Sequence, residues 1–373
     1  MHIREFGVET WMNAHETRCE LNLAETCVAS LSVGELLDLA GQGNSLLDDL
    51  LPLRLTYGAI EGSERLRRAI AALYANQSAA DVLVTHGAIG ANALVYQALV
   101  GAGDVVVSML PTYQQHYSIP ESLGAEVRPL WLKAENGFLP DLDELRLLAR
   151  GARLIALTNP NNPTGALIDR PMLEEIVAVA RAEGAWLLAD EVYRGVDQEG
   201  DGFTDSVADL YEKGISTGSM SKAYALAGLR LGWIVAPEEV LRAAMIHRDY
   251  NTISVSMIDD HLAALALEAS GQVLARSRAI TRANLAILSD WVAGQRSISW
   301  VRPRSGTTAL LRYDLDMPSA EFCRRLLDET GVLLVPGSAF DMDGHVRIGY
   351  ANATDILRQG LARMSAFLGR IEI

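Results

Sequence analysis

The feature that most constrains the fold of this chain is a series of short apolar runs, rich in β-branched residues, that are separated by segments of helical length. The runs begin at Asp81, Asp104, Ala125, Arg153, Ala185 and Leu231, and they read DVLVT, DVVVSM, AEVRPLWL, RLIALT, AWLLAD and LGWIVA. Strands that alternate with helices imply crossover connections and a mostly parallel sheet that is buried on both faces. The middle of the chain is therefore predicted to be α/β.

The two ends of the chain read differently from its middle. Residues before about Ser45 contain no strand-like run, whereas after about Ala263 a long helical pattern leads into TTALLRY, GVLLVPG and VRIGYA. This pattern predicts a smaller α+β domain that is built from both termini and covers one end of the central sheet. We place the large domain at residues 46–263 and the small domain at 1–45 and 264–373. The cleft between the domains is the expected ligand site.

The composition excludes several classes of protein. The 373 residues are 49% hydrophobic, and 32 basic against 47 acidic residues give a formal net charge of −15, which would repel a nucleic-acid backbone. No apolar stretch approaches the roughly 20 residues needed to cross a bilayer, and the charged N-terminus lacks the apolar core of a secretory signal. The scattered cysteines Cys19, Cys27 and Cys323 favour a reducing compartment, and no spacing of His, Cys and Asp indicates a metal. We therefore expect a cytoplasmic protein with no nucleic acid, membrane or metal as partner.

Polar residues gather in three loops that follow candidate strands. LTNPNNPTGA follows RLIA, ADEVYRG closes WLLAD, and GSMSKAY follows KGIST. In α/β sheets, ligands bind outside the carboxyl ends of the strands. Lys222 lies in the third loop among small and apolar residues, where a charged side chain indicates a function.

Seven motifs, in order along the chain, make it resemble the class I/II aminotransferases, which are fold-type I enzymes that depend on pyridoxal 5'-phosphate (PLP). The motifs are YGAIEGSERLR, THGAIGAN, PTY, NPNNPTG, ADEVY, SMSKAYALAGLRLGW and VRIGYA. The resemblance runs from about Tyr57 to Arg347, and the motifs are specific together although each is weak alone. It implies a large domain with a mostly parallel seven-stranded sheet flanked by helices, and PLP as the cofactor.

The resemblance also assigns the residues that would hold the cofactor ring. Lys222 would carry the cofactor as a Schiff base and afterwards move protons. Asp190 would keep the pyridine nitrogen protonated so that the ring can accept electrons. Asn162 and Tyr193 would hydrogen-bond the ring hydroxyl, and Tyr113 would stack on the face of the ring.

The phosphate of the cofactor needs amide donors and positive charge. The resemblance implies that the backbone N–H groups of Ala88 and Ile89 bind it at a helix N-terminus. Relatives have a hydroxyl residue there, whereas Ala88 and Ile89 can donate only from the backbone. Ser219, Ser221 and Arg230 would supply the side-chain contacts, with local capping as the alternative role of the two serines.

A tyrosine and an arginine extend the resemblance to the subunit interface and the substrate. Tyr57 resembles the tyrosine that reaches the phosphate of the neighbouring subunit, which implies a homodimer. Arg347 matches the arginine that forms a bidentate pair with the substrate α-carboxylate. A carboxylate held in this way favours breaking the Cα–H bond over decarboxylation. The predicted function is therefore a PLP-dependent aminotransferase that acts on an L-amino acid.

The N-terminal segment departs from the family pattern. Typical relatives have a glycine-bearing turn near the substrate, whereas this chain reads ELNLAETCVASLSVGEL. The segment is acidic through Glu9, Glu16, Glu20 and Glu25. Some of these carboxylates, with Glu9 and Glu25 as the candidates, could receive a cationic side chain such as a guanidinium; a solvated surface is the alternative.

Two other functions remain open. RDYNTISVS, ENGFLPDLDEL, SKAYALAGLRLGW and VLLVPGSAF are also similar to the branch of the family with cyclases that form capreomycidine or enduracididine from hydroxylated arginines. Those enzymes eliminate a β or γ substituent and close a ring without amino transfer. A regulatory protein that keeps the fold without catalysis is disfavoured, because each cofactor position holds the expected residue type and no basic DNA-binding extension precedes the domain. We expect structural or peripheral roles for His86, His116 and His247, since Lys222 fills the role of the base.

Overall fold

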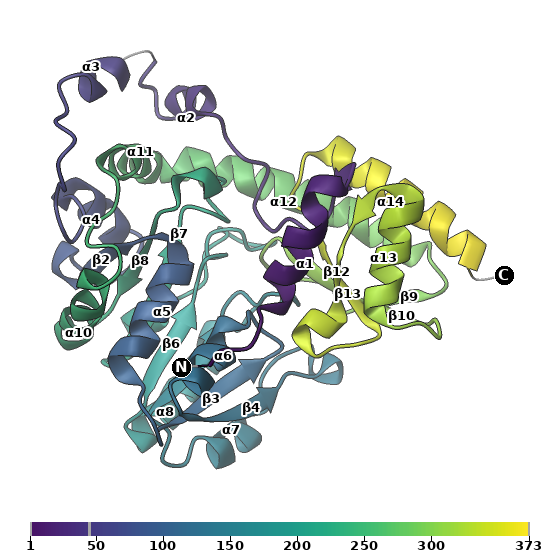
Figure 1. Cartoon of the computed structure of the whole chain (residues 1–373), viewed down its shortest axis with the longest axis horizontal. Helices are drawn as coiled ribbons and strands as arrows, with labels where there is room; N and C mark the ends of the chain where they lie inside the picture. The colour runs from purple at the N-terminus through teal and green to yellow at the C-terminus, as the bar shows by residue number, and fades with distance from the viewer. Residues whose placement is uncertain (1, 44–45, 372–373) are drawn as a thin grey trace.

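The computed structural model describes residues 2–43 and 46–371, and its central element is a seven-stranded sheet (Figure 1). The strand order is β2-β8-β7-β6-β5-β3-β4. β8 runs antiparallel to both of its neighbours, whereas the other adjacent strands are parallel. The strands are β2 (Val82–Thr85), β3 (Val105–Leu110), β4 (Glu126–Trp131), β5 (Leu154–Thr158), β6 (Trp186–Asp190), β7 (Gly214–Ser219) and β8 (Gly232–Val235). The predicted α/β fold with a mostly parallel seven-stranded sheet is confirmed.

Helices cover both faces of this sheet, which explains why its strands are apolar on both sides. Leu187 and Leu188, adjacent on β6, belong to two different core clusters on opposite faces. One face packs against α7 (Leu142–Leu148) and α8 (Arg170–Glu183), and the other against α5 (Gly87–Leu99) and α10 (Glu238–Asp249). The remaining helices of this part are α4 (Glu64–Ala71), α6 (Gln115–Ser122) and α9 (Val207–Leu210).

A second, antiparallel sheet lies beside the first and is built from the C-terminal part of the chain (Figure 1). Its order is β12-β13-β10-β9, with β9 (Ile298–Trp300), β10 (Thr308–Tyr313), β12 (Val335–Pro336) and β13 (His345–Gly349). α13 (Ser319–Thr330) and α14 (Thr354–Ile371) pack on it through one apolar cluster. The strand-like runs of the C-terminal sequence therefore form strands, as predicted.

The N-terminal residues contain a strand that we did not expect. β1 (Leu21–Asn22) pairs in parallel with β11 (Val332–Leu333). The prediction that the region before Ser45 contains no strand is therefore wrong. A strand of two residues is too short to produce a repeating pattern, so only its distant partner defines it. The pairing joins the first residues of the chain to its C-terminal part.

Helix α1 (Gly7–His15) lies between the two sheet systems (Figure 1). On one side, Val8 and Met12 pack in the cluster of Val335 and Phe340, and Trp11 Nε1 donates to the carbonyl of Leu334 at 2.8 Å. On its other side, the segment is held to α6, where Arg4 forms an ion pair with Glu121 and the Gly7 amide donates to Gln114 Oε1. The N-terminal segment is therefore fixed to both parts of the molecule.

The long helical pattern after the central sheet is broken once. It forms α11 (Met257–Glu268) and α12 (Ser270–Ala293), which are separated at Ala269, while α2 (Val33–Leu39) and α3 (Leu46–Leu50) precede the large sheet. The division at 46–263 stays a prediction, and its limit at 263 falls inside α11. Residues 1, 44, 45, 372 and 373 of that division lie outside the described residues. No helix in the described ranges is long and apolar enough to span a membrane.

Candidate active site

A cavity of about 400 Å³ lies where the carboxyl ends of the large-sheet strands meet the N-terminal segment and β13. Every expected site residue except Tyr57 lines it. These residues are Glu9, Glu25, Ala88, Ile89, Tyr113, Asn162, Asp190, Tyr193, Ser219, Ser221, Lys222, Arg230 and Arg347. Motifs that are far apart in the sequence therefore converge on one cavity.

Asp190 ends β6 inside the cavity and has a network of buried partners. Asn92 Nδ2 donates to Asp190 Oδ2 at 2.8 Å, and Thr217 Oγ1 donates to Asn92 Oδ1 at 2.7 Å. His116 Nε2 lies 3.5 Å from Asp190 Oδ2, and the hydroxyl of Tyr96 lies 2.9 Å from His116 Nδ1. The network fixes the carboxylate in one orientation.

Sequence reasoning missed Asn92 and gave His116 only a structural or peripheral role. Asn92 belongs to the motif THGAIGAN and lies in the first turns of α5, so that motif could have identified it. His116 is fully buried on α6. Its contact with Asp190 is a supporting one, because Nε2 faces the carboxylate rather than the open part of the cavity.

Lys222 follows β7 and extends its amine to the N-terminal segment. Nζ donates to Thr26 Oγ1 at 2.7 Å and lies 3.6 Å from Cys27 Sγ. Burial lowers the pKa of the amine, but the nearby Cys27, Tyr193 and Glu25 outweigh it, so the pKa lies above its usual value. Burial also raises the pKa of the Cys27 thiol, to about 11. Thr26 and Cys27 were not among the expected site residues.

An anion-binding end of the cavity forms where α5 begins. Gly87 has a φ of +68° and opens the helix, so the amides of Ala88 and Ile89 lie in its first turn, unpaired within the helix. A Cβ on Gly232 of β8 would collide with the backbone of Gly87 and Ala88, so only glycine permits this approach. Arg230 is an exposed side chain whose guanidinium lies beside Gly87.

Two serines complete this end of the cavity. Both are buried, Ser219 as the last residue of β7 and Ser221 two residues beyond it, and Ser219 Oγ accepts a hydrogen bond from the amide of Ser221 at 3.2 Å. This is the local bond that we considered as the alternative role. Both residues also line the cavity.

Arg347 on β13 is a buried cation with incomplete pairing. Nη1 donates to Asn162 Oδ1 at 3.2 Å and Nη2 donates to the carbonyl of Ala24 at 3.0 Å. Within residues 2–43 and 46–371, Nε has no hydrogen-bond partner. Burial lowers the pKa of the guanidinium, against the opposing effect of Tyr193 and Glu25. A buried cation without a carboxylate in contact is suited to receive an anionic group.

The acidic N-terminal residues divide into three cases. Glu9 accepts a hydrogen bond from the Tyr113 hydroxyl at 2.7 Å, and Glu25 Oε1 accepts from the amides of Thr26 and Cys27. Glu16 also lines the cavity as an exposed residue, and its carboxylate forms no hydrogen bond or ion pair in the part of the chain that the structure describes. Glu20 does not line this cavity.

Tyr57 does not reach the cavity of its own chain. Its side chain is 67% exposed, and its carbonyl accepts a hydrogen bond from Ser254 Oγ at 2.9 Å. The expected contact with a neighbouring subunit stays a prediction.

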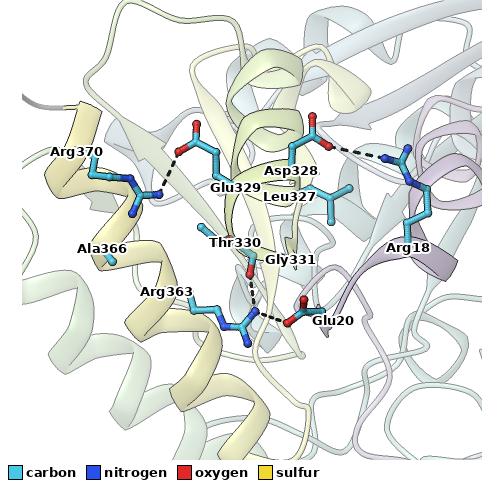
Figure 2. A pocket seen from close by; sticks show the side chains of 10 residues that line it. All are labelled: Arg18, Glu20, Leu327, Asp328, Glu329, Thr330, Gly331, Arg363, Ala366 and Arg370. Atoms are coloured by element: carbon cyan, nitrogen blue, oxygen red, sulfur yellow. Dashed lines mark hydrogen bonds and ion pairs between the residues drawn. The ribbon is translucent and has the colours of Figure 1, made fainter.

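A second hollow, of about 560 Å³, lies on the C-terminal part of the molecule (Figure 2). Its three arginines are paired, as Figure 2 shows: Arg18 with Asp328, Arg363 with Glu20, and Arg370 with Glu329. Since its charges are matched and exposed, we assign the functional site to the cavity around Lys222.

The residues of that cavity fit PLP. The unpaired amides at the start of α5, together with Ser219, Ser221 and Arg230, suit a phosphate, and Asp190 lies at the end of a neighbouring strand to meet a protonated ring nitrogen. The buried Nε of Arg347 is free for a carboxylate. No group of three or more metal-ligating side chains is found among the described residues.

Known proteins place the chain in one family. The sequence pattern of the family "Aminotransferase class I and II" matches residues 30–363. Capreomycidine synthase from Streptomyces vinaceus is 34% identical over 366 residues, which cover 97% of this chain and 93% of that protein. A crystal structure of a PLP-dependent aminotransferase from Streptococcus suis 89-1591 superposes with a TM-score of 0.96 at 42% identity, covering 100% of this chain and 99% of that one. The PLP-dependent cyclase OrfR superposes with a TM-score of 0.92 at 30% identity, covering 99% and 98%. The chain belongs to the class I and II aminotransferase family, and its cofactor is pyridoxal 5'-phosphate.

Proposed function

We propose that this chain is a PLP-dependent enzyme that removes the Cα proton of an L-amino acid with a cationic side chain. The observation that carries this proposal is the composition of one cavity. It contains the lysine Lys222, the buried arginine Arg347 and the carboxylates of Glu9 and Glu16. Bound in this cavity, the cofactor supplies an electron sink that stabilises the carbanion at Cα.

The residues around the cofactor have separate tasks in this proposal. Asp190, oriented by Asn92, would keep a proton on the ring nitrogen of the bound cofactor, and Tyr113 would contact the ring. Lys222 is the base that takes the Cα proton, because its amine is the mobile basic group of the cavity. Asn162 and Tyr193 would bind the ring hydroxyl, while the amides of Ala88 and Ile89, with Ser219, Ser221 and Arg230, would bind the phosphate.

The two ends of the substrate are bound by opposite charges. Arg347 forms a bidentate pair with the α-carboxylate and thereby presents the Cα–H bond to Lys222. Glu9 and Glu16 bind the cationic side chain. Glu25, which we also expected in this role, has one carboxylate oxygen committed to two backbone amides and contributes its charge rather than a direct contact.

For the fate of the substrate, we place elimination and ring closure ahead of transamination, which the sequence motifs had put first. The family pattern begins at residue 30, whereas the alignment with capreomycidine synthase covers 97% of this chain and therefore reaches into the acidic segment before it. After the Cα proton is removed, the hydroxyl of a β-hydroxylated arginine leaves as water. A guanidine nitrogen then bonds to that carbon and loses one proton, and Cα takes a proton back, so the net change is the loss of one water. A γ hydroxyl leaves in the same way if a Cβ proton is also removed and later returned. Transamination is the second candidate, favoured by the Streptococcus suis aminotransferase that covers the whole chain.

The deciding experiment is the visible absorbance spectrum of the purified protein during titration with arginine, hydroxylated arginines and citrulline. Citrulline is the matched control, because it has nearly the shape of arginine without the charge. Ring closure predicts loss of one water from a hydroxylated arginine and no keto acid. Transamination predicts a keto acid and loss of the cofactor's absorbance. Equal responses to arginine and citrulline would contradict a cationic substrate.

Replacement of the proposed base tests the chemistry itself. Lys222→Ala should reduce turnover by at least about 10³-fold, whereas Lys133→Ala, at an exposed position, should leave it unchanged. Full activity of the Lys222→Ala variant would refute the assignment.

We also propose that the working enzyme is a cytoplasmic homodimer in which Tyr57 contacts the phosphate of the partner's cofactor. Its exposure outside the cavity supports this role, as do the exposed apolar side chains of the ten residues that precede it in the sequence. Those side chains are Leu47, Leu51 and Leu55. A mixture of Tyr57→Phe and Lys222→Ala subunits should regain activity, because one site of each hybrid dimer is intact; no recovery after subunit exchange would contradict the shared site.

A further inference from the structure

The amine of Lys222 has a hydroxyl partner that comes from the N-terminal segment. Thr26 is 7% exposed, and its Oγ1 accepts a hydrogen bond from Lys222 Nζ at 2.7 Å. Cys27 Sγ, 3.6 Å from the same amine, is the second and more distant contact. These residues lie before residue 30, outside the part of the chain that the family pattern matches.

The position of Thr26 does not depend on Lys222. Its amide donates to Glu25 Oε1 at 2.8 Å, and its carbonyl accepts from Thr307 Oγ1 at 2.6 Å. The next residues continue this attachment, because the Val28 amide donates to the carbonyl of Lys222 and the Ala29 amide donates to the carbonyl of Ala351. The Thr26 hydroxyl is therefore a fixed point against which the amine is placed.

The segment contacts Lys222 at both ends of its side chain. The bond from Val28 fixes the backbone of Lys222, and the bond to Thr26 fixes the tip of its side chain. A long, flexible lysine side chain loses rotamer entropy when it is held in this way, and a favourable interaction must offset this loss. The hydrogen bond from the charged amine of Lys222 to the Thr26 hydroxyl is such an interaction.

We propose that Thr26 is a positioning residue for Lys222: its hydroxyl holds the amine at the N-terminal wall of the cavity while a substrate occupies the place that the amine has left. This inference rests on the proposed role of Lys222 as the residue that binds the cofactor. A neutral hydroxyl suits the task, because it orients the amine without adding a further negative charge to the groups that already raise the pKa of Lys222. The carboxylate of Glu25 is close by, but its Oε1 is bound to backbone amides.

The test is made on the cofactor-free protein and is practical because this chain contains few lysines. The sequence contains three lysines, Lys133, Lys213 and Lys222, so peptide mass spectrometry can follow each one. Acetic anhydride reacts with neutral amines and not with protonated ones. We would measure the rate of acetylation of Lys222 as a function of pH and compare it with the rate at exposed Lys133. The pH at which Lys222 becomes reactive reports how strongly the protonated amine is stabilised. We expect Thr26→Val to shift this profile to lower pH by about one unit, since the isosteric side chain cannot accept a hydrogen bond. Thr26→Ser should restore the wild-type profile.

A second readout separates positioning from structural support. In the enzyme loaded with PLP, Thr26→Val should reduce kcat by about tenfold with KM unchanged, because the variant misplaces the base, whereas Glu9 and Arg347, which we propose to bind the substrate, keep their hydrogen-bond partners. Thr281→Val is the matched control: Thr281 is a fully buried threonine on α12 whose hydroxyl donates within its own helix. It should leave the profile of Lys222 and kcat unchanged. If Thr26→Val does not fold, Thr26→Ala takes its place in both measurements.

The outcomes distinguish this inference from the proposed function. Borohydride reduction of the loaded protein, followed by peptide mapping, identifies the lysine that holds the cofactor. Label at Lys222 together with a wild-type profile in Thr26→Val would overturn the role of Thr26 alone. Label at another lysine would overturn the proposed function, whatever Thr26 does.

Discussion

The hydroxyl of Tyr113 donates a hydrogen bond of 2.7 Å to Glu9 Oε1. This bond joins the loop after β3 to helix α1, and burial together with the charge of Glu9 raises the pKa of the phenol. The donor role of the tyrosine is therefore stable at neutral pH, and the second oxygen of Glu9 stays available to a ligand. A substrate cation can pair with Glu9 without breaking the contact.

The first prediction concerns the charge of Glu9. Glu9→Gln keeps an oxygen that accepts the bond from Tyr113 and removes only the charge. We expect KM for arginine-like substrates to rise about tenfold, since partly buried ion pairs contribute about 1–2 kcal/mol, while the response to citrulline stays the same. Glu20→Gln, outside the cavity, is the control. An equal change for both substrates would mean that Glu9 is structural.

The second prediction concerns the carboxylate-binding arginine. Arg347→Lys keeps the positive charge but cannot form two parallel hydrogen bonds, so KM should rise about 10- to 100-fold. Argininamide, which lacks the carboxylate, should be handled equally by the variant and the wild type. Steady-state kinetics with both compounds test this, and a loss of the same size with the amide would show that Arg347 acts elsewhere.

The third prediction concerns the support of Asp190. Asn92→Leu removes the donor to Asp190 and leaves Thr217 Oγ1 without its acceptor. We expect the free energy of unfolding to fall by about 1–3 kcal/mol and PLP to dissociate more readily. Urea unfolding with and without PLP measures both effects, with Asn136→Leu at an exposed position as the control. Unchanged cofactor retention would separate Asn92 from the site.

The fourth prediction concerns pH. Burial raises the pKa of Asp197 to about 6, and Asp201 adds to this effect, against the hydrogen bond from Ser305. The folded state therefore binds the proton more tightly than the unfolded state, so this group makes the protein less stable as pH rises from 3.8 through about 6.

Asp197→Asn removes that dependence. Relative to the wild type, the variant should gain about 1–2 kcal/mol in the free energy of unfolding between about pH 5 and about pH 8. Asp316→Asn, at an exposed position, should show no such gain. If the difference in the free energy of unfolding between variant and wild type does not change with pH, the pKa of Asp197 is not raised by burial and the prediction is wrong.

The large sheet could be predicted because its strands are continuous apolar runs. The strands β5 and β6 are buried along their whole length, and the continuous apolar character of such strands identifies them in the sequence. β1 and β9 have only two and three residues, and their pairing defines them: β1 with the distant β11, and β9 with β10, the next strand along the chain. Local sequence holds too little information for such short elements.

The residues of the site could likewise be predicted where a local motif contains them, and not where only tertiary contacts define them. Lys222, Asp190 and Arg347 lie in motifs that local sequence displays, and the structure brings them to one cavity. The contact between Lys222 and Thr26 joins residues 196 positions apart, and it depends on how the N-terminal segment returns across the molecule. No periodicity or motif reports such a return, because it is set by tertiary packing.

The pairing of β1 with β11 has a consequence for the timing of synthesis. Leu21 is synthesised long before its partner Val332. The wall that carries Glu9 and Thr26 must wait for Val332, whereas the large sheet is complete at Val235. A nascent chain can thus assemble the sheet that binds the cofactor before it can enclose a substrate, and the reaction chamber closes only after β11 has been added.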